Sequence, residues 1–319
     1  MHGEAQNSPV PRGRLAPSPT GVLHLGNART FLLAWLDLRS RGGELLLRVE
    51  DLDGPRVRKE AVQATLEDLR WLGLDWDGPV VLQSHRLDRH RAALERLQEA
   101  GLVYPCTCSR RDIERAASAP HAGEEGPVYP GTCRGRWQDA AEAEAATGRL
   151  PAWRFRVPEG QHIGIEDRFA GHRSFPSEGL GDFVVWKRDG TPAYQLAVVV
   201  DDAEQGVDEI LRGEDLLPSA ARQRLLQEAL DLPLPRQAHV PLVVGEDGRR
   251  LAKRHGDTSL AGLRRQGVEP AEVRALLARW SGLDEEAARA GPAALLEGFA
   301  LERVPREPAV WRPGLLDPG

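Results

Sequence analysis

Apolar and polar positions in the N-terminal third of the chain follow the pattern of a parallel α/β protein. Two short apolar segments indicate buried strands, at residues 13–16 and 45–49. Three segments with apolar side chains at helical spacing indicate amphipathic helices, at residues 28–39, 58–72 and 86–100. Strand, loop, helix, strand and helix in this order predict βαβ units and a parallel sheet.

The same α/β pattern returns after a different middle section. Residues 104–190 contain turn residues and short strand-like pieces, which indicate an inserted α+β module. After it, residues 193–200 form an apolar run that predicts a strand ending in Asp201 and Asp202. Further strands are predicted at residues 209–212 and 240–244, a helix at 219–230, and helical structure from about residue 259 onward.

Composition and charge narrow the class of protein. The 319 residues are 41% hydrophobic and 28% charged, which excludes global disorder and a dense disulfide scaffold. No apolar run approaches the roughly 18 residues of a membrane span, and the N-terminus lacks a signal-peptide core, so we expect a cytoplasmic protein without a membrane partner. The net charge of −6 means that any contact with nucleic acid must be a local patch.

The first candidate phosphate site is the helix start His24-Leu25-Gly26-Asn27. Free N–H groups and the partial positive charge at a helix N-terminus attract phosphate. His24 is placed to donate a hydrogen bond, and Gly26 would let a nucleotide approach the backbone closely. The alternative is a plain capped loop without a ligand.

The second candidate phosphate site lies near the C-terminal end of the α/β pattern. The chain uses 39 arginines but only three lysines, yet it keeps Lys253 between Arg250 and Arg254. A lysine is a compact charge that can follow a moving phosphoryl group, which an arginine does less well. The alternative is a solvated basic turn.

The cysteines form a candidate metal site. Cys106, Cys108 and Cys133 are the only three in the sequence, and an odd, clustered set in a cytoplasmic protein favours a metal over disulfides. Three thiolates and a fourth ligand would complete a tetrahedral structural zinc site. His121 lies between the cysteines and is a common ligand type; three reduced cysteines without metal are the alternative.

Together, the histidine–glycine helix start and the lysine loop resemble class I aminoacyl-tRNA synthetases. The opening Arg-x-Ala-Pro-Ser-Pro-Thr-Gly, the run at residues 48–53 and the segment 194–216 are similar to the glutamyl-tRNA synthetase subgroup, so the resemblance covers residues 13–258. Only about 65 residues follow the lysine loop, as in the truncated glutamyl-Q tRNA(Asp) synthetase family. The zinc pattern of that family, Cys-x-Cys, then Tyr, three residues and Cys, matches Tyr129 and the three cysteines and favours Tyr129 over His121.

The resemblance implies an enzyme that activates L-glutamate with ATP and Mg²⁺ and transfers it to the queuosine base in the anticodon of tRNA(Asp). It assigns catalysis to His24 and Lys253. It assigns ATP binding to His24, Gly26, Asn27, Arg250 and Lys253. It assigns glutamate binding to Arg14, Ser18, Glu50, Tyr194 and Arg212. It assigns structural Zn²⁺ to Cys106, Cys108, Tyr129 and Cys133.

Two other functions stay open from sequence: a compact glutamyl-tRNA synthetase that charges the tRNA 3′ end, and a non-catalytic tRNA-binding protein on a synthetase scaffold. A structural ion pair is the alternative for Glu50 and Arg212. The family usually has serine where this chain has Ala252, which removes one hydroxyl near the phosphates.

The expected fold is α/β: a Rossmann-like parallel-sheet catalytic domain with an inserted zinc-containing α+β module and a short helical C-terminal region. The expected division is a flexible tail at 1–12, the two halves of the catalytic domain at 13–103 and 191–258, the inserted module at 104–190, and the C-terminal region at 259–319.

Overall fold

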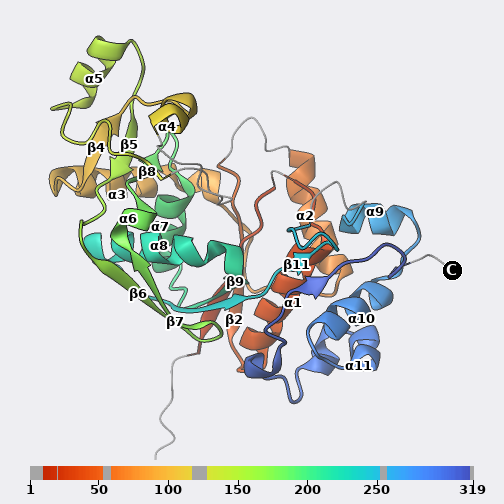
Figure 1. The fold of residues 1–319 in the computed structure, drawn as a ribbon. Helices are drawn as coiled ribbons and strands as arrows, with labels where there is room; N and C mark the ends of the chain where they lie inside the picture. The colour runs from red at the N-terminus through yellow and green to blue at the C-terminus, as the bar shows by residue number, and fades with distance from the viewer. Residues whose placement is uncertain (1–9, 20, 53–58, 117–127, 252–256, 317–319) are drawn as a thin grey trace, which may run out of the picture.

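The computed structural model describes residues 10–19, 21–52, 59–116, 128–251 and 257–316 (Figure 1). Its strands are β1 Arg12–Leu15, β2 Glu44–Val49, β3 Val81–Leu82, β4 Val103–Cys106, β5 Ala152–Phe155, β6 His162–Asp167, β7 Gly171–Pro176, β8 Phe183–Trp186, β9 Glu209–Gly213, β10 Arg236–Val240, β11 Val243–Val244 and β12 Ala309–Val310. Its α-helices are α1 Leu25–Arg39, α2 Lys59–Trp71, α3 Leu87–Glu99, α4 Arg110–Ala116, α5 Ala140–Thr147, α6 Ser177–Leu180, α7 Tyr194–Glu204, α8 Leu217–Ala229, α9 Leu260–Arg265, α10 Pro270–Trp280 and α11 Glu285–Ala290.

Parallel strands from the two α/β parts of the chain meet at the centre of the molecule. Strands β1, β2 and β3 pair in parallel in the order β1-β2-β3, and β9 pairs in parallel with β10. The two sets lie edge to edge, because the Asp208 backbone N–H donates to the Arg12 carbonyl oxygen at 2.9 Å. Gly13 permits this approach: a Cβ there would lie 3.2 Å from the Glu209 carbonyl oxygen.

The middle section of the chain contributes to two sheets. Strands β4, β5 and β8 form an antiparallel sheet that carries α4 and α5, at the upper left of Figure 1. The hairpin β6–β7 instead joins the strands of the second α/β part, since β6 pairs in parallel with β10 through Asp167 and Gln237.

Most predicted elements are present, and one predicted element is wrong. The predicted helices correspond to α1, α2, α3 and α8, and the strand at residues 209–212 is β9. Of residues 193–200, however, Ala193 is the N-cap of helix α7 and the rest belong to the helix, not to a strand. Every residue from Leu196 to Asp202 is buried, so the segment shows no polar face, and an apolar run alone does not distinguish a buried helix from a buried strand. The strand predicted at residues 240–244 is also divided, since β10 ends at Val240 and β11 is a separate two-residue strand.

A buried arginine connects the C-terminal helices to the sheet. Arg29 of α1 is fully buried and donates to the carbonyl oxygens of Pro241, at 2.6 Å, and Trp280, at 3.2 Å, and to the Ser281 hydroxyl at 3.2 Å. Because Trp280 ends α10 and Pro241 follows β10, these bonds fix α10 against the centre of the molecule. No helix among the described residues is long and apolar enough to cross a membrane.

Candidate active site

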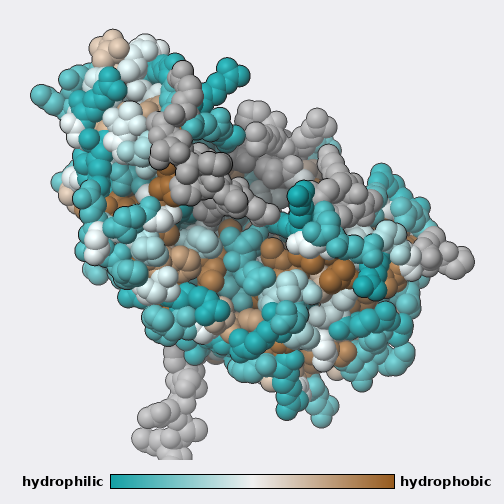
Figure 2. All heavy atoms as spheres, in the orientation of Figure 1, coloured by the Kyte–Doolittle hydropathy of each residue, from teal (hydrophilic) through white to brown (hydrophobic). Residues whose placement is uncertain are grey.

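A cavity of about 560 Å³ opens at the carboxyl ends of the parallel strands, the usual place for a ligand in such a sheet. Figure 2 shows apolar surface gathered across the middle of this face of the molecule, between more hydrophilic ends. The cavity brings together nine of the residues predicted from sequence: Arg14, Ser18, His24, Gly26, Asn27, Glu50, Tyr194, Arg212 and Arg250. Lys253 lies outside the described residues.

Arg14 and Glu50, which line the cavity, belong to a buried cluster of charges. Asp202 of α7 accepts hydrogen bonds from Arg14 Nε at 3.2 Å and from Arg48 Nη1 at 2.7 Å with the same oxygen, Oδ1. Arg48 Nη2 also lies 3.3 Å from Glu50 Oε1. No side chain of the cluster is more than 10% exposed. Two cations and two carboxylates thus balance each other, and burial in such a network holds their geometry.

The two carboxylates of this cluster differ in pKa. Burial raises the pKa of Asp202, but Arg14 and Arg48 outweigh burial and bring the net pKa below its usual value. Burial also raises the pKa of Glu50, and here Arg48 and Arg14 do not fully compensate, so its pKa stays above its usual value. Asp202 is therefore the firmly ionised carboxylate, whereas a cation bound in the cavity would stabilise the ionised form of Glu50.

A third arginine, Arg212 of β9, also lines the cavity. Its Nε donates to His239 Nε2 at 2.9 Å, its Nη2 donates to Gln237 Oε1 at 3.0 Å, and its Nη1 lies 3.5 Å from the Tyr194 hydroxyl. Arg212 is only 5% exposed, and burial lowers its pKa. A buried guanidinium that faces a cavity favours an anionic ligand there.

His24 is the N-cap of helix α1, and its conformation depends on both neighbours in the predicted motif. Its Nδ1 accepts from the backbone N–H groups of Gly26 and Asn27 at 3.1 and 3.4 Å, and the Asn27 side chain accepts from the His24 backbone N–H. Burial, helped by the charge of Arg250, lowers the pKa of His24 to about 4. His24 is therefore neutral near pH 7 with its proton on Nε2, which leaves that N–H as a donor.

Gly26 lies close against the His24 side chain. A Cβ at position 26 would lie 3.0 Å from His24 Cε1 and 3.1 Å from His24 Nδ1. A side chain at this position would push the imidazole by a few tenths of an ångström, so the glycine favours the present orientation of the histidine.

Basic side chains also line the cavity near its opening. Arg250 forms an ion pair with Asp215, with Nη1 and Oδ2 at 2.8 Å. Lys187, one of the three lysines, lines the cavity and donates from Nζ to the Leu52 carbonyl oxygen at 3.2 Å. The sequence gave no reason to place Lys187 in the site.

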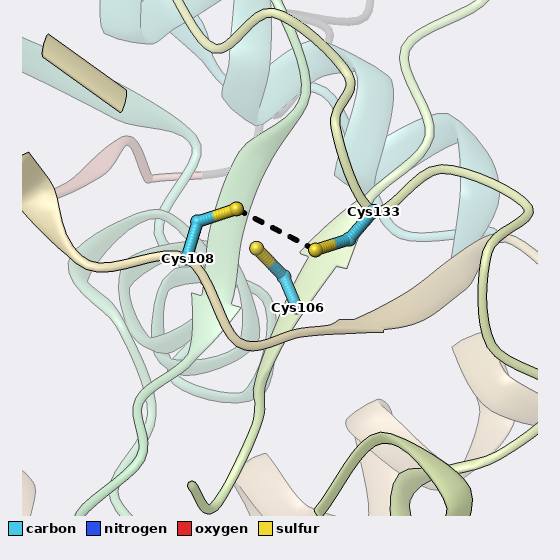
Figure 3. Close-up of side chains that lie close together, drawn as sticks. All are labelled: Cys106, Cys108 and Cys133. Carbon is cyan, nitrogen blue, oxygen red and sulfur yellow. Dashed lines mark hydrogen bonds between the residues drawn. The ribbon is translucent and has the colours of Figure 1, made fainter. Parts of the chain in front are cut away.

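The three cysteines converge in the antiparallel sheet module (Figure 3). Their sulfur atoms all lie within 4.8 Å of one another, with Cys108 and Cys133 at 3.5 Å. The Tyr129 hydroxyl lies 3.3 Å from Cys106 Sγ and 3.7 Å from Cys108 Sγ, so its oxygen is a fourth candidate metal ligand. His121 lies outside the described residues.

These four donors fit a tetrahedral zinc ion. Zinc–sulfur bonds of about 2.3 Å place sulfur atoms roughly 3.8 Å apart, between the 3.5 Å of the Cys108–Cys133 pair and the 4.8 Å that bounds the three sulfur atoms here. Arg154 adds positive charge beside the donors: its Nε donates to Cys106 Sγ at 3.3 Å, and its guanidinium lies 3.8 Å from the Tyr129 ring centre. A cation in this position favours anionic ligands.

The sequence did not predict the buried residues that contact the predicted site residues and fix their positions. Asp202, Arg48, His239 and Gln237 are all buried and contact Arg14, Glu50 or Arg212. The sequence contained one usable signal, since Arg48 interrupts an otherwise apolar strand and Asp202 ends an apolar run, and buried charges of this kind are paired.

Comparison with known proteins identifies the family. The model for the catalytic domain of class I tRNA synthetases (E and Q) matches residues 11–290. The chain belongs to this family. As a member, it is a ligase-type enzyme with the class I catalytic fold, and the resemblance seen in its sequence motifs is confirmed.

Two relatives of this synthetase-family chain match it over nearly their full length. It is 50% identical to the glutamyl-Q tRNA(Asp) synthetase of Symbiobacterium thermophilum, over 93% of this chain and 94% of that protein. It is 53% identical to the glutamyl-Q tRNA(Asp) synthetase of Nocardia farcinica, over 96% of this chain and 95% of that protein. The crystal structure of a glutamate tRNA ligase from Elizabethkingia meningosepticum in complex with its amino acid is similar with a TM-score of 0.78 and 27% identity, over 96% of this chain but 68% of that chain.

Proposed function

We propose that this synthetase-family enzyme activates L-glutamate with ATP and transfers it to the queuosine base in the anticodon of tRNA(Asp). The observation that carries the proposal is the combination of three features in one cavity. Arg212 is a buried arginine without an ion-pair partner among the described residues, Glu50 is a carboxylate of raised pKa, and His24 caps the start of helix α1. These features correspond to an anionic side chain, an ammonium group and a phosphate.

Glutamate is the amino acid that this cavity suits best. Arg212 would bind the side-chain carboxylate, with Tyr194 beside it, and Glu50 would bind the α-ammonium group. Arg14 and Ser18 would complete the pocket, Arg14 through a charge-assisted contact to a carboxylate. Glutamine has no charge on its side chain, so its binding would leave the Arg212 cation buried and uncompensated, and the pocket would reject it.

ATP would bind at the start of α1. The Nε2–H of neutral His24 and the free N–H groups of the helix would contact its phosphates, with Gly26 and Asn27 maintaining the histidine conformation and Arg250 and Lys253 adding positive charge. Mg²⁺ would neutralise phosphate charge. The α-carboxylate of glutamate attacks the α-phosphorus, the bond to pyrophosphate breaks, and glutamyl-adenylate forms. His24 and Lys253 stabilise the charge that develops on the phosphates.

In the second step, a hydroxyl of the queuosine cyclopentene ring attacks the carbonyl carbon of the adenylate, and AMP leaves. The relatives support this acceptor over the tRNA 3′ end, because the chain is 50% and 53% identical to the two glutamyl-Q tRNA(Asp) synthetases and 42–45% identical to glutamate–tRNA ligases. We further propose that Cys106, Cys108, Tyr129 and Cys133 hold a structural Zn²⁺, and that residues 13–103 and 191–258 form the two halves of the catalytic domain around the module at 104–190.

Exchange of labelled pyrophosphate into ATP tests the activation step. We expect exchange to be much faster with glutamate than with glutamine, measured with and without tRNA, since some enzymes of the subgroup require tRNA for activation. A protein that binds tRNA but supports no amino-acid-dependent exchange under either condition would be non-catalytic, and the proposal would fail.

A further inference from the structure

The arginines of the cavity differ in how their charges are balanced. Arg14 forms an ion pair with Asp202. Arg250 forms one with Asp215. Arg212 is as buried as Arg14, yet among the described residues it contacts no carboxylate.

The partners of Arg212 on the protein side are instead neutral groups. His239 and Gln237, both on β10, accept from its Nε at 2.9 Å and its Nη2 at 3.0 Å. Both partners are buried, so these bonds fix the orientation of the guanidinium within the sheet. The Nη1 group, beside the Tyr194 hydroxyl, and the second N–H of Nη2 are then left for a ligand.

A second contact of His239, with Asp167, fixes its tautomer, while burial keeps it neutral. His239 Nδ1 lies 2.6 Å from Asp167 Oδ2, and Asp167 Oδ1 accepts from the backbone N–H groups of Phe169, Ala170 and His239. Asp167 is thus an ionised acceptor, Nδ1 carries the imidazole proton, and the lone pair of Nε2 faces Arg212. Burial lowers the pKa of His239 to about 4, with the Arg212 charge acting in the same direction against Asp167.

We propose that His239 and Gln237 are positioning residues for substrate selection: they hold Arg212 through neutral acceptors, so that its charge is left for the side-chain carboxylate of the bound amino acid. An acidic residue at either position would orient Arg212 equally well but would neutralise it. The cavity would then lose its electrostatic reason to prefer a carboxylate over an amide. This inference rests on the proposed function and adds the residues that set its specificity.

The test compares glutamate with glutamine in pyrophosphate exchange for Gln237→Glu, His239→Glu and His239→Gln. Gln237→Glu is nearly isosteric, so it tests the added charge even where His239→Glu disturbs folding. We expect each acidic variant to lower the glutamate-over-glutamine ratio of kcat/KM by at least about tenfold, the order of one charge-assisted hydrogen bond, with the KM for ATP unchanged. His239→Gln keeps a neutral acceptor and should retain the ratio within about threefold.

His90 provides the matched control. It is a fully buried histidine that contacts an aspartate, Asp201, at 3.0 Å, and it has no contact with Arg212. His90→Gln should leave the ratio unchanged, which separates selection from a general loss of a buried histidine. Thermal unfolding of every variant verifies that it is folded.

The outcomes distinguish this inference from the proposed function. A wild-type enzyme that does not activate glutamate contradicts the proposed function and the inference with it. A wild-type enzyme that activates glutamate, with folded Gln237→Glu that retains the wild-type ratio, overturns the inference alone. Loss of the ratio in His239→Gln to the same extent as in the acidic variants also overturns it, because charge would then not be the cause.

Discussion

Replacing Asp202 by asparagine should destabilise the protein strongly, because Asp202 balances two buried arginines. Its Oδ1 accepts from Arg14 Nε and Arg48 Nη1, and all three side chains are at most 4% exposed. Asparagine has nearly the same shape but no charge. The cluster would then hold two guanidinium groups against Glu50 alone, whose pKa burial already raises.

The expected loss follows from the cost of breaking a buried ion pair, about 3–5 kcal/mol in the free energy of unfolding. That is a large share of the roughly 5–15 kcal/mol that stabilises a typical protein. The same substitution should raise the KM for glutamate, since Arg14 would lose its anchor in the cavity wall.

Chemical denaturation at neutral pH measures the effect, with Glu285→Gln as the control. Glu285 forms an ion pair with Arg279 at 2.7 Å, but on the protein surface, where such pairs contribute at most about 1 kcal/mol. A loss in Asp202→Asn as small as that in the control would refute the reasoning that Asp202 holds the cluster.

Four further predictions concern the cavity and the cysteines. Gly26→Ala should lower kcat for pyrophosphate exchange by at least about tenfold without unfolding the protein, because the new Cβ would displace His24. Lys253→Ala should lower the same rate by at least about tenfold through loss of phosphate stabilisation. The KM for glutamate should rise as the pH falls, because protonated Glu50 does not bind an ammonium group. Since burial raises the pKa of Glu50, the rise should begin at a higher pH than for an ordinary carboxyl, and a KM that does not change at acidic pH would contradict this. Elemental analysis should find about one zinc per wild-type chain and none in Cys133→Ser, and a wild-type protein purified without chelator that lacks zinc would refute the metal site.

The sequence predicted the residues that face the cavity better than the residues behind them. Arg14, His24 and Glu50 lie in loops or near strand ends, where motif and spacing carry information about ligands. His239 and Gln237 lie inside a strand, and their function depends on the pairing of β9 with β10, which no local pattern specifies.

The error in helix α7 has a similar physical origin. Leu196 to Asp202 are buried on every side, so the period that separates a helix from a strand is absent from the sequence. The same burial explains why Asp202 contacts Arg14 and Arg48, because a helix buried on all faces places its aspartate among other elements. Sequence pattern identified the α/β class but not this helix behind the cavity.

Transfer of labelled glutamate to tRNA(Asp) with and without queuosine tests the central claim most directly. We predict that wild-type enzyme labels only the queuosine-containing tRNA. Periodate also attacks the ring diol of queuosine, so in the control the 3′ end is oxidised first and queuosine is introduced afterwards. We predict that this tRNA is still labelled. The account would be contradicted if tRNA lacking queuosine were labelled equally well and if this labelling were lost after oxidation of the 3′ end. That result would show that the enzyme charges the 3′ adenosine.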